Sequence, residues 1–195
     1  MDTLAAGLAR LLGGPVPSVQ RLSGGASQET WAFEALLGGT AQPLILRRAP
    51  PGAELRGSGN AGLAAEAVLI RRAGAVGVPV PDVVAVLQPS DGLGDGFLMR
   101  RLRGETLGRR LAAAHRPALA WQCGAALARL HTINMAVPDS PALRQTQPRS
   151  EVAHLAAKHA RHGTVRPVFQ LALRWLAEHA PADVAPTLVH GDFRN

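Results

Sequence analysis

The sequence predicts an α+β fold in two lobes, with an antiparallel sheet within residues 1–103 and helices over residues 104–195. Short segments in which apolar and polar residues alternate fill the first part, whereas longer segments with apolar residues at helical spacing fill the second. Hydrophobic residues make up 47% of the chain and charged residues 18%, which is typical of a protein that buries a core.

The first lobe is expected to begin with an amphipathic helix over residues 2–12, which Asp2 or Thr3 can cap and Gly13-Gly14 can end. Short segments with strand-like alternation follow at about 17–22, 28–35, 43–48, 83–88 and from 97 onward. A loop rich in Pro and Gly over 49–60 leads into a second helix at 61–74.

Helices are expected to dominate after Gly104. Apolar residues recur at helical spacing in four segments separated by Pro-rich loops, at 105–114, 117–133, 150–162 and 167–179. The segment 97–103 would then be the hinge between an N-terminal lobe at 1–103 and a helical lobe at 104–195.

The charge of the chain does not predict a nucleic-acid partner. The net charge is +7, but the basic residues are spread along the chain, and all of them except Lys158 are Arg. Aromatic residues, on which bases of single strands could stack, are scarce, with four Phe, three Trp and no Tyr. The charge instead favours small anionic partners.

The cysteine content and the hydropathy pattern predict a soluble cytoplasmic protein. Cys123 is the single cysteine, which excludes an internal disulfide and a zinc site built from several cysteines. The sequence begins without the basic start and apolar run of a secretory signal. No stretch approaches the roughly 20 apolar residues that span a membrane.

A glycine-rich segment, Ser23-Gly24-Gly25-Ala26-Ser27, separates the first two predicted strands. Glycines let backbone N–H groups approach phosphate oxygens closely, and the two serine hydroxyls can add donors. The segment is not a Walker loop, because it lacks the Gly-Lys-Ser/Thr ending and leads into a strand. A plain hairpin turn is the alternative.

The third predicted strand carries adjacent arginines, Arg47 and Arg48. Side chains alternate along a strand, so only one of the two can face a cleft, and we expect Arg47 to be that residue. It stands where kinases place the strand lysine that contacts nucleotide phosphates, and Glu66 on the following helix is its expected ion-pair partner. Solvated surface charges are the alternative.

The predicted hinge has backbone groups that could read the edge of an adenine, with Met99 as an apolar wall beside the ring. Taken alone, this segment is simply a strand that leaves a sheet.

The end of the sequence, Leu188-Val189-His190-Gly191-Asp192-Phe193-Arg194, has the His-x-Asp pattern of a kinase catalytic loop after a short apolar strand. Asp192 is the candidate base that accepts the proton of a substrate hydroxyl. His190 is expected to brace the loop, and Arg194 to contact a phosphate or the substrate.

Together these segments resemble the aminoglycoside phosphotransferase and choline-kinase-like family. The bacterial branch similar to the kinase-like domain fused to some acyl-CoA dehydrogenases is the nearest match. The matching stretches are 22–31, 46–52, 65–69, 78–81, 97–99, Leu127-Ala128 with Leu130-His131, and 188–194.

The resemblance implies a protein-kinase-like two-lobe fold and a transfer of the γ-phosphoryl group of ATP, with Mg²⁺, to a hydroxyl of a small molecule. In that family arrangement Ser23 to Ser27 cover the phosphates, Arg47 pairs with Glu66, residues Met99 to Arg101 hold adenine, and Asp192 is the base. Aminoglycosides, other amino alcohols, sugars and hydroxyacyl-CoA thioesters are all acceptors within the wider family.

The sequence departs from the family at its C-terminal end. The metal-binding Asn of the kinase pattern follows five residues after the aspartate, but Asn195 is the last residue, three positions after Asp192. The acidic motif that holds Mg²⁺ and further helices are also absent, so no metal ligand is assigned.

We therefore expect an N-terminal fragment with an incomplete helical lobe, little or no turnover, and exposed apolar faces on 117–133 and 167–179. A truncated homologue that binds a nucleotide or a partner without catalysis is the alternative; the sequence indicates no oligomeric state.

Overall fold

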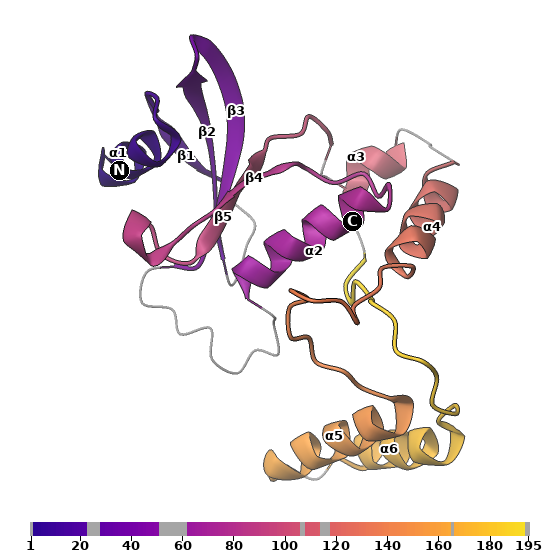
Figure 1. The fold of residues 1–195 in the computed structure, drawn as a ribbon. Helices are drawn as coiled ribbons and strands as arrows, with labels where there is room; N and C mark the ends of the chain where they lie inside the picture. Colours follow the sequence, from indigo (N-terminus) through magenta and orange to yellow (C-terminus); the bar gives the residue numbers. More distant parts are fainter. Residues whose placement is uncertain are drawn as a thin grey trace. The chain divides into compact units, whose positions relative to one another are not determined.

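The computed structural model describes residues 2–22, 28–50, 62–105, 108–113, 118–164 and 166–193. A five-stranded antiparallel sheet with the order β1-β2-β3-β5-β4 forms its N-terminal part (Figure 1). The strands are β1 (Val19–Leu22), β2 (Glu29–Leu37), β3 (Thr40–Arg48), β4 (Val83–Val86) and β5 (Gly96–Arg100). The predicted α+β class with an antiparallel sheet is confirmed.

Two helices cover opposite faces of this sheet. The helix α1 (Asp2–Leu12) buries Leu4 and Leu8 in a cluster with sheet residues that include Leu46. The helix α2 (Leu63–Ala75) buries Leu63 against Phe97 of β5 on the other face. Full burial of such side chains stabilises the fold by about 1.5–3 kcal/mol each, so both helices are fixed by their apolar stripes.

The β2–β3 hairpin is longer than predicted. Leu37 pairs with Thr40 across a turn in which Gly38 and Gly39 both have positive φ, 57° and 78°. Two such residues form the turn whose twist matches that of antiparallel strands, so pairing continues up to the turn itself. The third strand therefore begins at Thr40, before the apolar run from which it was predicted.

The close approach of β5 to β3 requires a glycine at position 96. A Cβ atom there would lie 2.5 Å from the Arg47 carbonyl oxygen and 2.8 Å from Arg48 Cβ. We expect Gly96→Ala to lower the free energy of unfolding by about 1–3 kcal/mol, because backbone atoms of the central strand would have to move. Urea denaturation checks this, with Gly104→Ala as the control, since a Cβ at Gly104 meets no atom within 4 Å. An equal effect of both substitutions would contradict the packing argument.

Four α-helices follow in the described part of the chain after the sheet (Figure 1). They are α3 (Gly108–Ala113), α4 (Ala118–Leu130), α5 (Pro148–Arg161) and α6 (Pro167–His179), close to the predicted bounds. A 3-10 turn, η1 (Pro89–Asp91), precedes β5. No described helix is long and apolar enough to cross a membrane.

Large apolar side chains are exposed on α4 and α6, as expected from the sequence. Trp121 on α4 is 79% exposed. On α6, Leu171 is 70% and Trp175 is 56% exposed. These helices therefore present apolar surface that the described residues do not cover.

The chain divides into two compact units, Met1–Ala142 with Leu188–Asn195, and Leu143–Thr187. Within the first, Arg72 near the end of α2 donates hydrogen bonds to Ser140 Oγ at 2.7 Å and to the Asn134 carbonyl at 3.4 Å. Arg129 of α4 donates to the Gly77 carbonyl at 2.9 Å. These bonds connect the end of α2 to the chain that follows the sheet. The lobe boundary between residues 103 and 104 stays a prediction.

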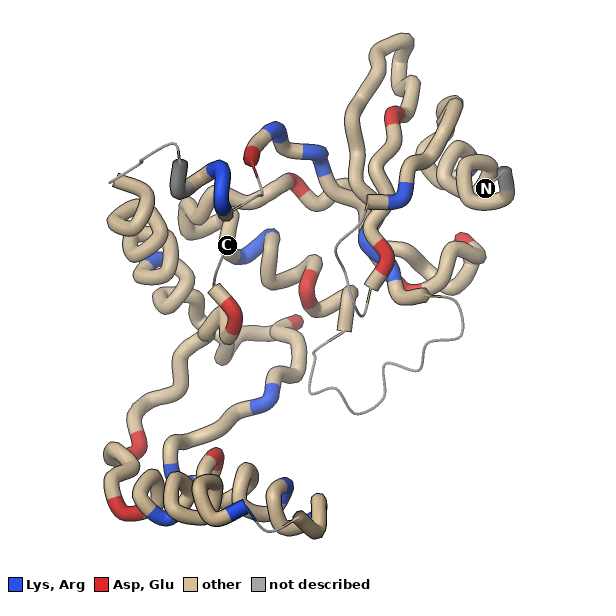
Figure 2. The backbone as a smooth tube through the Cα atoms, turned by 180° about the vertical axis from the view of Figure 1, so that it is seen from behind, with Lys and Arg blue, Asp and Glu red and all other residues tan. Residues whose placement is uncertain are grey.

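Basic residues occur on many elements instead of gathering on one of them. Figure 2 shows Lys and Arg on the strands, on α2 and on the later helices, with Asp and Glu interspersed. The positive charge is therefore not concentrated on one described element.

Candidate functional site

An ion pair joins β3 to α2. Arg47 Nε lies 2.9 Å from Glu66 Oε1, with the two side chains 37% and 35% exposed. Within the described residues Arg47 Nε makes no hydrogen bond, so the contact is electrostatic. Glu66 stands in the first turn of α2, where the helix dipole favours a negative charge. The guanidinium is thus oriented and stays partly open to solvent.

Alternation along β3 places Arg47 and Arg48 on opposite faces of the sheet. Arg47 is on the α2 face, together with Ile45 of the same strand. Arg48 is on the α1 face, where its Nε donates to Glu29 Oε2 at 2.9 Å and its side chain is only 15% exposed. The structure therefore supports the expectation that only one of the two arginines faces the α2 side.

Glu29 is a buried carboxylate at the start of β2, 8% exposed. Burial alone raises the pKa of its carboxyl. The hydrogen bonds from Trp31 and Arg48, with the charges of Arg48 and Arg21, outweigh that effect and hold the pKa below the ordinary value of 4.5. Glu29 is therefore ionised at neutral pH.

The predicted hinge lies at the end of β5. Met99 pairs with Ile45 of β3, so it lies on the same face as Arg47, and it packs against the cluster around Phe97. Arg101 is exposed, and its N–H donates to the Pro43 carbonyl at 3.1 Å. The Arg100 N–H likewise donates to the Asp82 carbonyl at 2.9 Å. Because the N–H groups of Arg100 and Arg101 are already bonded, an adenine edge would have to bind to other backbone groups of this segment. The predicted adenine contacts of Met99 and Arg101 stay predictions.

The His-Gly-Asp segment forms a turn at Gly191, whose φ is 78°. The Asp192 N–H donates to His190 Nδ1 at 3.3 Å, and the rings of His190 and Phe193 meet edge to face with centroids 5.3 Å apart. His190 thus contacts both Asp192 and Phe193, and its bracing role stays a prediction. The side chains of His190 and Asp192 are exposed.

The short apolar strand predicted before this turn is absent. Residues 187–189 have no strand conformation. The glycine segment Ser23 to Ser27, residues 51–60 of the loop predicted over 49–60, and Arg194 lie outside the described residues. Their predicted roles therefore stay predictions.

No group of three or more His, Cys, Asp or Glu residues that could hold a metal ion occurs within the described ranges. The described residues therefore do not make up a Mg²⁺ site by themselves.

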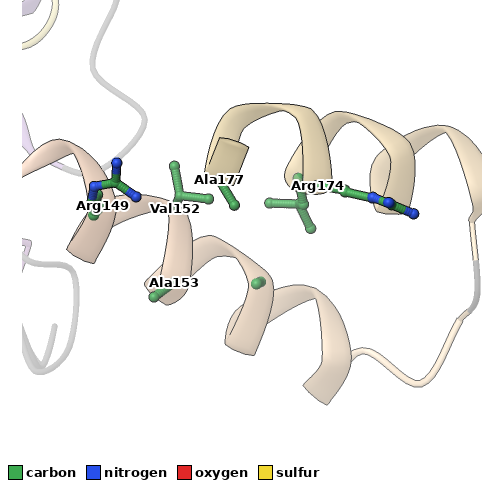
Figure 3. Close-up of a pocket in the computed structure, with 7 residues that line it drawn as sticks. Arg149, Val152, Ala153, Arg174 and Ala177 are labelled. Atoms are coloured by element: carbon green, nitrogen blue, oxygen red, sulfur yellow. The ribbon is translucent and has the colours of Figure 1, made fainter. Parts of the chain in front are cut away.

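A groove of about 360 Å³ lies between α5 and α6, and none of the predicted site residues lines it. Figure 3 shows Val152, Ala153 and Ala177 along it, with Arg149 and Arg174 towards its two ends. Arg174 Nε donates to Glu178 at 3.0 Å. Small side chains between two packed helices leave such a gap, and we assign it no role.

Sequence reasoning missed the set of residues around Glu29. Arg21 precedes the glycine segment by two positions and Glu29 follows it by two, which is a signal that the sequence contains. The register that brings Arg48 to Glu29 comes from the pairing of β2 with β3, which spacing alone did not reveal.

The third strand of the antiparallel sheet carries an Arg paired with a Glu of the next helix, and helices and a His-Gly-Asp turn follow. This arrangement parallels that of kinases, in which a strand Lys pairs with a helix Glu and a His-x-Asp loop follows. The chain belongs to the phosphotransferase enzyme family, whose model matches residues 18–195.

Two crystal structures share this fold. A proposed aminoglycoside phosphotransferase from Ralstonia eutropha JMP134 superposes with a TM-score of 0.67 at 18% identity, covering 93% of this chain and 54% of the other. A proposed fructosamine-3-kinase from Thermobifida fusca YX-ER1 gives 0.58 at 19% identity, covering 98% and 67%. The chain thus spans about half the length of the first of these proteins. Comparison with curated proteins found no match.

Proposed function

We propose that this chain carries the nucleotide lobe and the start of the catalytic loop of an ATP-dependent small-molecule kinase. The reaction forms a bond between an acceptor hydroxyl oxygen and the γ-phosphorus, breaks the bond to the β–γ bridging oxygen, and releases ADP. The proton of the hydroxyl passes to a carboxylate. Such a reaction fits the cytoplasmic location that the sequence predicts.

The Arg47–Glu66 ion pair is the observation that carries this proposal. A strand cation held by a helix carboxylate is the arrangement that positions nucleotide phosphates in kinases. The partial exposure of Arg47 leaves N–H groups of the guanidinium open to a phosphate oxygen. The charge and geometry of the pair therefore fit an ATP phosphate.

The remaining residues would act as follows. Ser23, Gly24, Gly25, Ala26 and Ser27 would donate N–H and hydroxyl groups to the phosphates. Asp192 would orient the acceptor hydroxyl and accept its proton late in the transfer, with His190 holding the turn around it. Arg194 would contact a phosphate or the acceptor, which is a small molecule with a hydroxyl group.

Magnesium would neutralise charge on the transferring phosphoryl group, a contribution of several kcal/mol to catalysis. Among the described residues, no group of three or more His, Cys, Asp or Glu side chains could hold the metal ion. We therefore propose that the 195-residue chain binds ATP with little or no turnover.

The purified chain tests this proposal. We expect calorimetric titration to detect ATP binding, and an assay of ADP release in the presence of Mg²⁺ to detect no turnover above that of Asp192→Ala. Failure to bind ATP would contradict the nucleotide site. Robust Mg²⁺-dependent ADP release that Asp192→Ala abolishes would contradict the inactive state and support a complete catalytic site.

A further inference from the structure

One carboxylate links the first three strands at the end of the sheet that borders the glycine segment. Glu29 Oε2 accepts hydrogen bonds from Trp31 Nε1 at 3.1 Å and from Arg48 Nε at 2.9 Å. Its Oε1 lies 3.4 Å from Arg21 Nη2. We call these four residues the Glu29 network. Because β1, β2 and β3 each contribute to it, the network fixes the three strand ends relative to one another.

Trp31 makes the network dependent on charge. The guanidinium carbons of Arg21 and Arg48 lie 5.9 Å and 5.8 Å from the centroid of its ring, within the range of cation–π attraction. Two cations beside a single ring repel each other, and the Glu29 charge between them offsets that repulsion. Glutamine at position 29 would have the same shape but could not provide this compensation.

The position of the network in the chain matters more than its contribution to overall stability. Buried ion pairs contribute little net free energy, since desolvation offsets the attraction. Arg21 is the last residue but one of β1, and Glu29 is the first residue of β2. Their contact therefore joins the end of β1 to the start of β2, and Ser23 to Ser27 lie between these two strands in the sequence.

The network also reaches the strand cation. Arg48 follows Arg47 directly, and it donates a further hydrogen bond, 3.4 Å long, to the Leu93 carbonyl. Since Arg48 is held on the α1 face, the backbone that directs Arg47 towards Glu66 on the other face is held as well.

We propose that Glu29 is a positioning residue, which holds the ends of β1, β2 and β3 together and thereby fixes Arg47 in the orientation that binds a nucleotide phosphate. The part of this inference that concerns nucleotide rests on the function proposed above. The part that concerns the strand ends does not.

Glu29→Gln is the main test, with Glu34→Gln as the matched control, because Glu34 is an exposed carboxylate on the same strand. Hydrogen exchange is measured on peptides that cover 19–22 and 29–31, and on 96–100 as a reference. We expect exchange at the two strand ends to become about tenfold faster in Glu29→Gln, since loss of a buried ionic partner favours local opening. The reference peptide and the control variant should not change.

ATP affinity distinguishes a positioning residue from one that only stabilises the strand ends, because the latter would leave the affinity unchanged. We expect ATP to bind Glu29→Gln about tenfold more weakly at a temperature where the variant is folded. The urea midpoint of unfolding is measured beside it, because Arg48 loses its buried partner and the free energy of unfolding should fall as well. Unchanged exchange at the strand ends would overturn the proposal. Faster exchange with unchanged ATP affinity would overturn the positioning role and leave a local structural one.

Failure of the proposed function gives a different result. If the wild-type chain does not bind ATP, the nucleotide site is wrong, and the exchange data still decide whether Glu29 holds the strand ends. If Glu29→Gln does not fold, Arg21→Gln replaces it, because the Arg21 side chain is 59% exposed and the change is milder. Hydrogen exchange at the strand ends and ATP affinity are then measured on Arg21→Gln. Faster exchange with weaker ATP binding would support the proposal, and no change in either quantity would overturn it.

Discussion

Replacing Arg47 with alanine is expected to weaken ATP binding by about 10- to 100-fold, the effect of losing a charged hydrogen bond to a phosphate. The substitution leaves Glu66 without its cation, so a carboxylate would also face the phosphates. Arg47→Lys keeps the charge but loses the planar fork of donors, and we expect an intermediate affinity. Calorimetric titration of the three proteins measures these differences.

Arg71→Ala is the matched control for Arg47. Arg71 is an exposed arginine on α2, and its one described hydrogen bond, to the Val83 carbonyl, is 3.4 Å long. Removal of this charge changes the net charge equally but should alter ATP affinity less than twofold, since an exposed charge is screened at physiological salt. If both variants lose the same affinity, the protein attracts ATP through its general positive charge, and the Arg47–Glu66 pair is not the binding site.

Local patterns were sufficient to predict the parts of the fold that depend on neighbouring residues. The first helix was predicted at 2–12 and is found at Asp2–Leu12, because its apolar stripe and Gly13, which ends it with a φ of 68°, are local signals. The predicted caps, Asp2 and Thr3, lie within the helix instead of before it. The opposite orientations of Arg47 and Arg48 follow from strand alternation alone. The resemblance to the kinase pattern added Glu66 as the partner of Arg47.

Features that depend on pairing between distant segments were not predicted. The burial of Glu29 arises from the register of β2 with β3, which places Arg48 directly across from it. The apolar residues Leu188 and Val189 were interpreted as a strand, but a strand needs a neighbour for its backbone hydrogen bonds. The position of β5 between β3 and β4 likewise comes from tertiary pairing, and the local sequence contains no signal for it.

Phe97→Ala is expected to have the largest effect on stability, a loss of about 3–5 kcal/mol in the free energy of unfolding. The Phe97 side chain is fully buried, and it packs against Leu63 and Ala67 of α2. Removal of the ring leaves a cavity beneath α2, the helix that carries Glu66. Domains of this kind are stable by only about 5–15 kcal/mol in total, so the variant should unfold at a much lower urea concentration.

The same substitution at Phe169 separates the packing effect from the loss of a phenyl group in general. Phe169 of α6 is 49% exposed, and its described ring contact is an edge-to-face one with His159. We expect Phe169→Ala to cost less than about 1.5 kcal/mol, because little apolar surface leaves a buried environment. Phe97→Leu should fall between the two, since it keeps most of the apolar volume. If Phe97→Ala is no more destabilised than Phe169→Ala, then α2 is not held by this cluster. The Arg47–Glu66 ion pair would then have to be maintained by contacts other than the packing of α2 on the sheet.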